Sequence, residues 1–280
     1  MRGVAICIVG PGGTQVAVDE SVGTWTVNGT PEAAGSLAGR SIERAVALAM
    51  AGEVDGIVTA PVDKSALAAA GFTFPGHTEM LATLAGAEVA MMLASDKLRV
   101  VLVTTHLPLR DVPSVLSVER IVRTARVTAE GLRAWFGIMT PRLALCALNP
   151  HAGDGGRFGR EDEELLTPAA REAGIAGPFP ADTVFVRAMR GEFDAVLAPY
   201  HDVGMTAVKV ASFGSAVNVT LGLPFPRTSP DHGTALDIAG QGKADPSSMK
   251  AALRLCADIA RRINGVRLHT GVRLRHSDGV

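Results

Sequence analysis

The stretch Leu143-Ala-Leu-Cys-Ala-Leu-Asn-Pro-His-Ala-Gly153 carries the pattern that decides the fold. It opens with continuously apolar residues, which is typical of a strand buried on both faces of a sheet. Asn149 and Pro150 then end the strand in a loop, and a helical pattern begins near Glu161. This order of apolar strand, proline-containing loop and helix is the repeating unit of a parallel α/β sheet.

The same unit occurs at two other places in the chain. Apolar strands are predicted at Leu98–Thr104 and Ala195–Ala198, and they lead into loops that hold His106 and His201. A C-terminal helix is predicted to open at Asp245, with a proline at its first helical position. These patterns predict an α/β fold in which helices cover both faces of a largely parallel sheet.

The first 30 residues follow a different pattern, rich in valine, threonine and glycine. Short apolar runs at Val4–Val9, Thr14–Val18 and Thr24–Val27 predict the strands of a meander. From Ser36 the apolar residues recur with a helical period, and Gly52 provides a plausible end to that helix.

Composition and charge exclude several classes of protein. The chain has 280 residues, of which 47% are hydrophobic, and its net charge is −1. It therefore lacks the basic surplus expected of proteins that bind nucleic acids or anionic membranes. The three cysteines, Cys7, Cys146 and Cys256, each lie in an apolar run and are predicted to be buried free thiols. Free thiols, with no signal peptide recognised, predict a cytoplasmic location.

Three histidines share one position relative to the predicted strands. His106, His151 and His201 each follow an apolar strand, in a loop stiffened by proline. Ligands of open α/β sheets bind beyond the carboxyl ends of the strands, and three imidazoles there suit a divalent metal with one position left open. Asp202 and Asp154 are candidates to orient the rings. A loop histidine taken alone is usually an ordinary loop residue, and only the threefold repeat of one placement makes a metal site an equal alternative.

Other residues indicate a site for an anion. The segment Gly76-His-Thr-Glu79 precedes a helical pattern, so its amides and the Thr78 hydroxyl could receive an anion at a helix start. Lys209 and Arg227 could clamp a carboxylate or phosphate. The alternatives are an ordinary helix cap for the first segment and plain surface cations for the two basic residues.

At these residues the sequence resembles the 4-hydroxythreonine-4-phosphate dehydrogenase family. The resemblance covers roughly residues 54 to 263, in the order of the family's motifs. The matching stretches are Gly71–Glu79, Thr104–Asp111, Leu148–Gly156, Pro180–Phe185, Tyr200–Asp202, Val217–Ser229 and Asp231–Asp245.

The resemblance implies an isopropylmalate-dehydrogenase-like fold, with two α/β domains flanking a cleft. Residues 1–105 together with 228–280 would form the first domain, which holds the cofactor loop, and residues 106–227 would form the second domain. The family begins with a Gly-Asp-Pro-Ala-Gly-Ile-Gly-Pro-like segment that this sequence lacks. The first domain is therefore expected to be shortened at its N-terminus.

The resemblance also assigns residues to roles. It implies a divalent metal (zinc, magnesium or cobalt) on His106, His151 and His201, completed across the interface of a homodimer. It implies substrate contacts at His77, Thr78, Lys209, Asn218 and Arg227. Oxidation of a hydroxyl group also needs a catalytic base, for which Lys209 and Asp202 are the candidates. NAD would bind at Asp231, His232, Gly233, Thr234, Ala235 and Asp237, in a loop that does not use the usual glycine-rich fingerprint.

The activity implied is an NAD- and metal-dependent oxidation, with decarboxylation, of a small phosphorylated hydroxy acid. The expected reaction converts 4-phosphohydroxy-L-threonine to 3-amino-2-oxopropyl phosphate in vitamin B6 synthesis. One alternative is a related dehydrogenase of phosphothreonate, phosphoerythronate or an aromatic cis-dihydrodiol. Others are a metal-dependent decarboxylase that has lost NAD and a non-catalytic binding protein. Neither a nucleic acid nor a membrane is expected as a partner.

Overall fold

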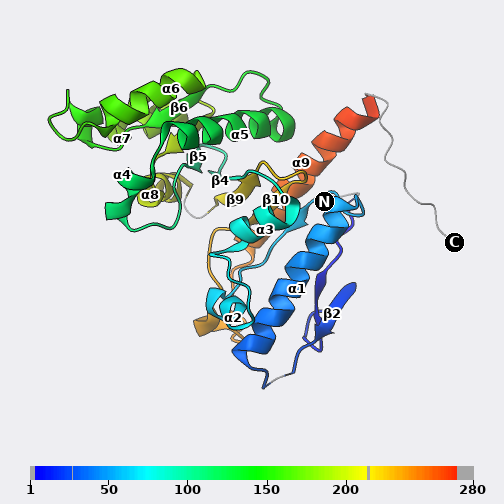
Figure 1. The fold of residues 1–280 in the computed structure, drawn as a ribbon. Helices are drawn as coiled ribbons and strands as arrows, with labels where there is room; N and C mark the ends of the chain where they lie inside the picture. Colours follow the sequence, from blue (N-terminus) through cyan, green and yellow to red (C-terminus); the bar gives the residue numbers. More distant parts are fainter. Residues whose placement is uncertain (1–3, 27, 213–214, 270–280) are drawn as a thin grey trace. The chain divides into compact units, whose positions relative to one another are not determined.

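The computed structural model describes residues 4–26, 28–212 and 215–269. The chain divides into two compact units, the first made of Met1–Ala87 and Leu223–Val280 and the second of Glu88–Gly222. The fold is mixed α/β (Figure 1), which confirms the predicted fold class. Within the described ranges, no helix combines the length and the apolar character needed to cross a membrane.

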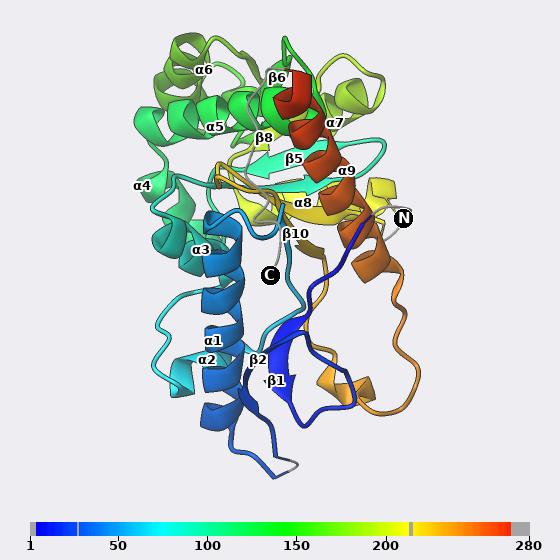
Figure 2. The same cartoon turned by 90° about the vertical axis from the view of Figure 1, so that its right-hand side faces the viewer.

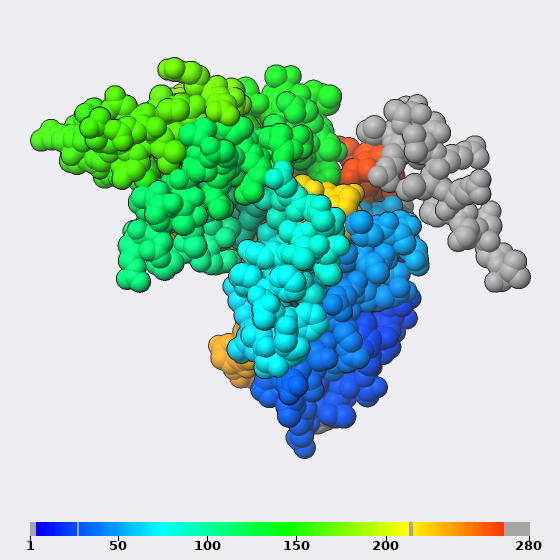
Figure 3. Space-filling model, in the orientation of Figure 1, coloured from blue at the N-terminus to red at the C-terminus, as the bar shows by residue number. Residues whose placement is uncertain are grey.

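The first unit contains two short pairs of parallel strands and four α-helices among its described residues. Strand β1 pairs with β2, and β3 pairs with β10. Helix α9 packs against β10 and β3, whereas α1 packs against α2 and α3, whose cyan surfaces lie directly beside α1 in Figure 3. The elements are β1 (Val9–Gly12), β2 (Glu20–Thr24), α1 (Pro31–Met50), β3 (Ile57–Val58), α2 (Lys64–Ala69), α3 (His77–Ala85), β10 (Arg227–Pro230) and α9 (Ser247–His269).

The N-terminal residues correct the sequence prediction in two ways. Strands β1 and β2 are parallel, so they are not part of a meander, and they cover Val9–Gly12 and Glu20–Thr24 instead of the three predicted runs. Cys7 precedes β1 and is exposed, contrary to the prediction, whereas Cys146 and Cys256 are buried as expected. Cys7 is exposed because the apolar residues around it belong to no strand or helix that would bury them.

Helix α1 begins at Pro31, five residues before the predicted start. The hydroxyl of Thr30 accepts a hydrogen bond from the amide of Ala33, and the proline occupies the first turn, where its missing N–H costs nothing. The helix ends at Met50, and Gly52 follows with a φ of 75°, so the predicted stop is correct.

The second unit is built on six strands in the order β9-β4-β5-β8-β6-β7. All pairs are parallel except those of β4, which runs antiparallel to both β9 and β5. The strands are β4 (Ala90–Ala94), β5 (Arg99–Leu102), β6 (Leu143–Cys146), β7 (Ala176–Phe179), β8 (Ala195–Ala198) and β9 (Val217–Leu221).

Helices cover both faces of this sheet, as predicted. The core on one face is formed by alternate strand residues and by side chains of α7 and α8, including Phe185 and Val208. Helix α5 packs against β4, β5 and β9, and Figure 2 shows β5 between α5 and α8. The helices are α4 (Val112–Val115), α5 (Val118–Phe136), α6 (Thr167–Ala173), α7 (Ala181–Met189) and α8 (His201–Ser212).

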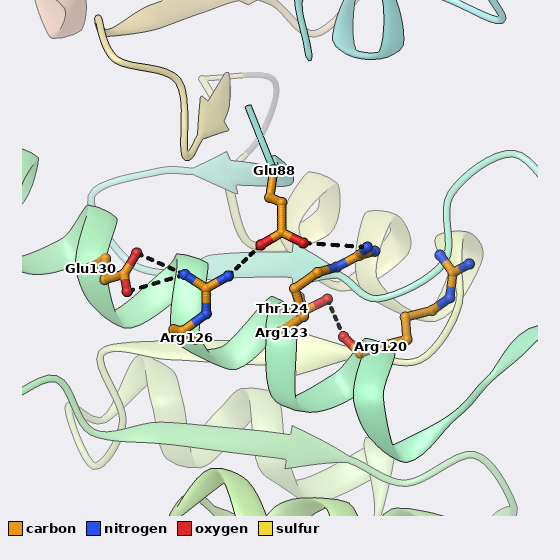
Figure 4. A network of polar contacts seen from close by, with 6 residues as sticks. All are labelled: Glu88, Arg120, Arg123, Thr124, Arg126 and Glu130. Atoms are coloured by element: carbon orange, nitrogen blue, oxygen red, sulfur yellow. Dashed lines mark hydrogen bonds and ion pairs between the residues drawn. The ribbon is translucent and has the colours of Figure 1, made fainter. Parts of the chain in front are cut away.

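A network of ion pairs fastens the start of β4 to α5 (Figure 4). The carboxylate of Glu88 contacts the guanidinium groups of Arg123 and Arg126, and Arg126 also lies 3.3 Å from Glu130. All four side chains are largely exposed, so water and salt screen the network and its contribution to stability is small.

The close approach of α1 and α2 predicts one sharp difference between two glycine substitutions. Gly35 lies on α1 where an added Cβ would overlap the carbonyl of Ala66, so Gly35→Ala should lower the free energy of unfolding by about 2 kcal/mol or more. Gly265 lies on α9 in open space, so Gly265→Ala should raise it by about 0.5–1 kcal/mol. Urea unfolding followed by circular dichroism measures both. Equal stability of Gly35→Ala and the parent would contradict the close approach.

Candidate active site

Strand β8 lies between β5 and β6, and all three run parallel. Their carboxyl ends therefore meet at one edge of the sheet, where the following loops emerge. His106 lies in the loop after β5, His151 in the loop after β6, and His201 is the first residue of α8, which follows β8. The pattern of strand, loop and histidine found in the sequence thus corresponds to three neighbouring strands.

Two of these imidazoles lie side by side. The ring centroids of His106 and His201 are 5.4 Å apart, and the ring planes are inclined by 41°. Nδ1 of His201 lies 2.7 Å from Oδ1 of Asp202, a contact that fixes the ring orientation and leaves Nε2 available. Asp154, the other candidate for orienting a ring, forms an ion pair with Arg157 at 3.8 Å.

His151 is held in an unusual backbone conformation. Its φ is 53° and its ψ is 29°, in the left-handed region, which costs a residue other than glycine about 1–2 kcal/mol. Its ring centroid lies 6.2 Å from that of Phe158. Within the residues that the structure describes, no three histidine, cysteine or acidic side chains are grouped to hold a metal ion. The ring contacts thus join His106 to His201 and His151 to Phe158.

The paired rings fit a divalent metal as two of its ligands. A tetrahedral ion about 2 Å from each nitrogen sets the centroids of two ligating imidazoles roughly 5 Å apart, close to the distance of 5.4 Å between His106 and His201. Because neutral imidazole accepts zinc, cobalt and other divalent ions, the donor chemistry does not select one metal.

A buried cation forms the centre of a second cluster, in the first unit. Arg227 begins β10 and is only 2% exposed, and its Nη2 donates a hydrogen bond of 2.6 Å to Oγ1 of Thr59. Burial lowers the pKa of Arg227 to about 10, so the guanidinium remains charged at neutral pH. A buried charge of this kind requires compensation, and the carboxylate of Glu79 acts in that direction.

His77 belongs to the same cluster. It is the first residue of α3, after the N-cap Gly76, so the predicted helix start is correct, and Thr78 follows in the same turn. Its pKa is lowered from 6.5 to about 4, mainly by burial and then by the positive charges of Arg227 and Lys64. The imidazole is therefore neutral at physiological pH.

Lys64 was not identified from the sequence. It opens α2 directly after Asp63, whose carboxylate accepts hydrogen bonds from the amides of Ser65 and Ala66. A Cβ added at Gly76 would lie 3.8 Å from Cε of Lys64, which places the lysine stem beside the start of α3. In the sequence this segment indicates only a capped helix, because the proximity of Lys64 to His77 arises from the packing of both α2 and α3 against α1.

The remaining predicted substrate residues lie in the second unit. Asn218 is in β9, and its Oδ1 is buried without a hydrogen-bond partner among the described residues. Lys209 lies on an exposed part of α8. Seven residues separate it from Asp202, so the two candidate bases share one face of the helix about 10 Å apart along its axis.

The predicted cofactor loop lines a pocket of about 410 Å³ within the first unit, a size in the range of small-molecule sites. His232, Gly233, Thr234 and Ala235 are among its lining residues. The two aspartates predicted with them are not part of the lining: the amide of Asp231 donates to Ser248, and the carbonyl of Asp237 accepts from Gln241. Leu236 and Ile238 of the same loop also line the pocket, together with Pro61, which the sequence did not indicate, and they make much of the wall apolar.

Paired imidazoles at strand ends, a buried arginine beside a neutral histidine and a loop pocket are features of α/β enzymes that act on small anionic molecules. Comparison with known proteins identifies the family within this class. The model of the family described as pyridoxal phosphate biosynthetic protein PdxA matches residues 13–256. The chain belongs to this family, which confirms the resemblance found in the sequence.

Two similar curated proteins are both named 4-hydroxythreonine-4-phosphate dehydrogenase. The protein of Desulfosudis oleivorans is 51% identical over 238 residues, which cover 82% of this chain and 70% of the relative. That of Stenotrophomonas maltophilia is 45% identical over 258 residues, covering 90% and 79%. The relatives are dehydrogenases, so the prediction of an oxidoreductase is confirmed at the level of the family.

Solved structures agree with this assignment. The crystal structure of 4-hydroxythreonine-4-phosphate dehydrogenase from Klebsiella pneumoniae superimposes with a TM-score of 0.76 at 46% identity, covering 82% of this chain and 72% of that one. A terephthalate 1,2-cis-dihydrodiol dehydrogenase from Burkholderia xenovorans gives a TM-score of 0.62 at 29% identity, covering 86% and 82%.

The depressed pKa of His77 predicts how stability depends on pH. Because the folded pKa of about 4 lies below the unfolded value near 6.5, the unfolded chain binds the extra proton first as pH falls. The free energy of unfolding therefore includes the full contribution of neutral His77 above pH 6.5. This contribution is lost as the pH falls toward 4. Between about pH 7.5 and about pH 5 this loss should amount to about 1–2 kcal/mol.

Urea unfolding at these two pH values measures the effect. His77→Gln carries no titrating group and should show a smaller loss of stability than the parent. The exposed His232 provides the control, since His232→Gln should keep the parent's pH dependence. An unchanged pH dependence in His77→Gln would contradict the assignment.

Proposed function

We propose that this chain is an NAD- and divalent-metal-dependent dehydrogenase that oxidises and decarboxylates 4-phosphohydroxy-L-threonine to 3-amino-2-oxopropyl phosphate in vitamin B6 synthesis. The observation that carries the proposal is the 51% identity, over 82% of this chain, to a relative named 4-hydroxythreonine-4-phosphate dehydrogenase. The geometry supports each part of this activity separately.

The anionic end of the substrate binds to basic and amide groups in this proposal. Arg227 supplies a buried positive charge, and neutral His77 and Thr78 supply donors at the start of α3. Lys209 and Asn218, in the second unit, are the other predicted substrate contacts; the side-chain NH2 of Asn218 can donate to an anion, whereas its buried Oδ1 can only accept. Fixed charges and oriented donors of this kind hold the reacting carbon in place and lower the entropic cost of reaction.

The metal ligands in this proposal are His106, His201 and His151. The 5.4 Å spacing of the first two rings supports them as a pair from one chain. In this proposal a second copy of the chain completes the set of ligands, as the resemblance to the family implies. The functional protein is accordingly a homodimer whose sites lie at the interface.

A base must remove the proton of the substrate hydroxyl, and Lys209 and Asp202 are the two candidates. Asp202 contacts His201, which favours its role in orienting that ring. Lys209, on the same face of α8, is then left as the proton acceptor. The loop residues His232–Ala235 would hold the nicotinamide cofactor, which would supply the hydride acceptor, and the histidines would hold a metal ion that would supply stabilisation of negative charge on the substrate oxygen.

Two alternatives are related activities. A dehydrogenase acting on an aromatic cis-dihydrodiol is favoured by the similarity to the terephthalate dihydrodiol enzyme, but at 29% identity this relative is more distant. The buried Arg227 also suits a phosphorylated substrate better than an uncharged ring. A decarboxylase without NAD is disfavoured by the 410 Å³ pocket in the cofactor loop.

A panel of substrates read by NADH absorbance tests the proposal. It includes 4-phosphohydroxy-L-threonine, phosphothreonate and a cis-dihydrodiol, each with and without a chelator. We expect turnover of the first compound, with loss of activity after chelation and recovery on adding zinc, magnesium or cobalt. Turnover of another panel member in its place would reassign the substrate, and full activity of chelated His151→Ala would refute the metal role.

Lys209→Ala should lower kcat by about 100-fold or more, because a positioned base contributes about 10²–10⁴-fold to rate. The matched control is Lys97→Ala, an exposed lysine in the turn between β4 and β5, which should retain parental activity. If both variants behaved alike, Lys209 would not be the base.

A further inference from the structure

The loop after β6 contains six consecutive residues with positive φ. They run from His151 to Gly156, with values of 53°, 54°, 83°, 48°, 65° and 86°. Three of them, His151, Ala152 and Asp154, are not glycine and adopt this conformation only where the surrounding structure enforces it. The groups that enforce it therefore determine where the His151 imidazole lies.

The start of this loop is held by one buried carboxylate. Asp162 is 1% exposed and lies in the π-helical turn Asp162–Leu166. Its Oδ1 accepts a hydrogen bond of 2.8 Å from the amide of Leu148, and its Oδ2 accepts one of 2.9 Å from the amide of Asn149. Both carboxylate oxygens of Asp162 thus accept hydrogen bonds from the two backbone amides that directly precede Pro150 and His151.

Neighbouring contacts also hold this loop against the segment that carries Asp162. The side-chain amide of Asn149 donates a 2.8 Å hydrogen bond to Glu161, the residue before Asp162. A Cβ added at Gly159 would lie 2.6 Å from both side chains, and one added at Gly153 would lie 2.9 Å from the carbonyl of Gly159. The left-handed turn therefore fits closely onto the segment that carries the carboxylate.

The chemistry of Asp162 indicates more than loop packing. Burying a carboxylate costs free energy, and among the described residues no cation forms an ion pair with Asp162. Its charge is satisfied by the two amides instead. A neutral side chain could cap one amide, but only a carboxylate directs two acceptors to adjacent amides.

We propose that Asp162 is a positioning residue for His151, which it holds in the orientation required for metal binding. The proposal rests on the proposed metal role of His151. Asp162 touches neither substrate nor metal; it acts through the backbone of Leu148 and Asn149, so that removing its charge lets His151 leave the left-handed conformation and weakens the site.

The chain offers a matched control at the other end of the same strand. Asp194 accepts a 2.7 Å hydrogen bond from the amide of Arg142, directly before β6, and contacts that guanidinium at 3.0 Å. Asp162 fastens the carboxyl end of β6 and Asp194 fastens its amino end, so substitutions at both remove a carboxylate–amide contact from one strand. Only the first lies beside a candidate ligand.

The experiment measures Co²⁺ binding to the full chain, by calorimetry and by the visible absorption of the bound ion, with thermal unfolding in parallel. Asp162→Asn should weaken Co²⁺ binding by about 10–100-fold, the usual effect of losing a group that orients a ligand. Asp162→Glu keeps the carboxylate and should restore most of the affinity. Asp194→Asn should change affinity by less than about twofold, although it lowers the melting temperature.

Two further variants separate this proposal from the proposed function. His151→Ala should weaken Co²⁺ binding, and adding Asp162→Asn to it should have no further effect, because both changes act through one ligand. The positioning role is wrong if His151→Ala weakens binding and Asp162→Asn does not. If His151→Ala leaves binding unchanged, the metal role of His151 is wrong and the role of Asp162 is overturned with it.

Discussion

The parallel pairing of β8 with both β5 and β6 is the constraint on which the site depends. Val196 of β8 lies opposite Val100 of β5 and Ala144 of β6, so the register of all three strands is fixed together. A shift by one residue would turn every buried side chain of a strand to the opposite face. Because these strands are buried apart from the half-buried Arg99 of β5, such a shift is not tolerated, and the loops that follow them keep their positions.

In the first unit, burial determines the charge states of two neighbouring side chains, Arg227 and His77. Arg227 stays charged despite burial because its intrinsic pKa is high, whereas His77 beside it becomes neutral. The cluster therefore carries positive charge at the arginine and at Lys64, and an uncharged imidazole that both charges affect. An anion with several oxygen atoms matches this arrangement better than a neutral ligand does.

Much of the fold could be predicted from the sequence where local patterns were strong. Ala195–Ala198 was predicted exactly as found, because four apolar residues stand between Asp194 and Pro199. Strand β4 was missed, and with it the antiparallel pairing, since its continuous apolar run between two short turns gives no sign of direction. Cys7 was assigned to a buried strand because apolar residues surround it, although no partner element covers them.

The site was predictable to a similar degree. The sequence placed the three histidines directly after predicted strands, where the structure has them, whereas the roles of Arg227 and of the Asp231–Asp245 loop stay predictions. Lys64 escaped detection because only tertiary packing brings α2 beside α3. The left-handed turn at His151 could not be predicted for another reason. The glycines after it are typical of a flexible loop, whereas the enforced conformation depends on Asp162, which lies 11 residues later.

The division of the chain has a consequence for its synthesis. The second unit is one continuous segment, Glu88–Gly222, whereas the first is assembled from both ends of the chain. Strand β3 at Ile57–Val58 must therefore wait for β10 at Arg227–Pro230 to leave the ribosome before it can pair. Domains fold as units during translation, so the histidine-bearing sheet is complete while the amino-terminal segment is still without its partner. We expect a nascent chain that ends near residue 222 to protect the second unit from protease and to leave the first exposed.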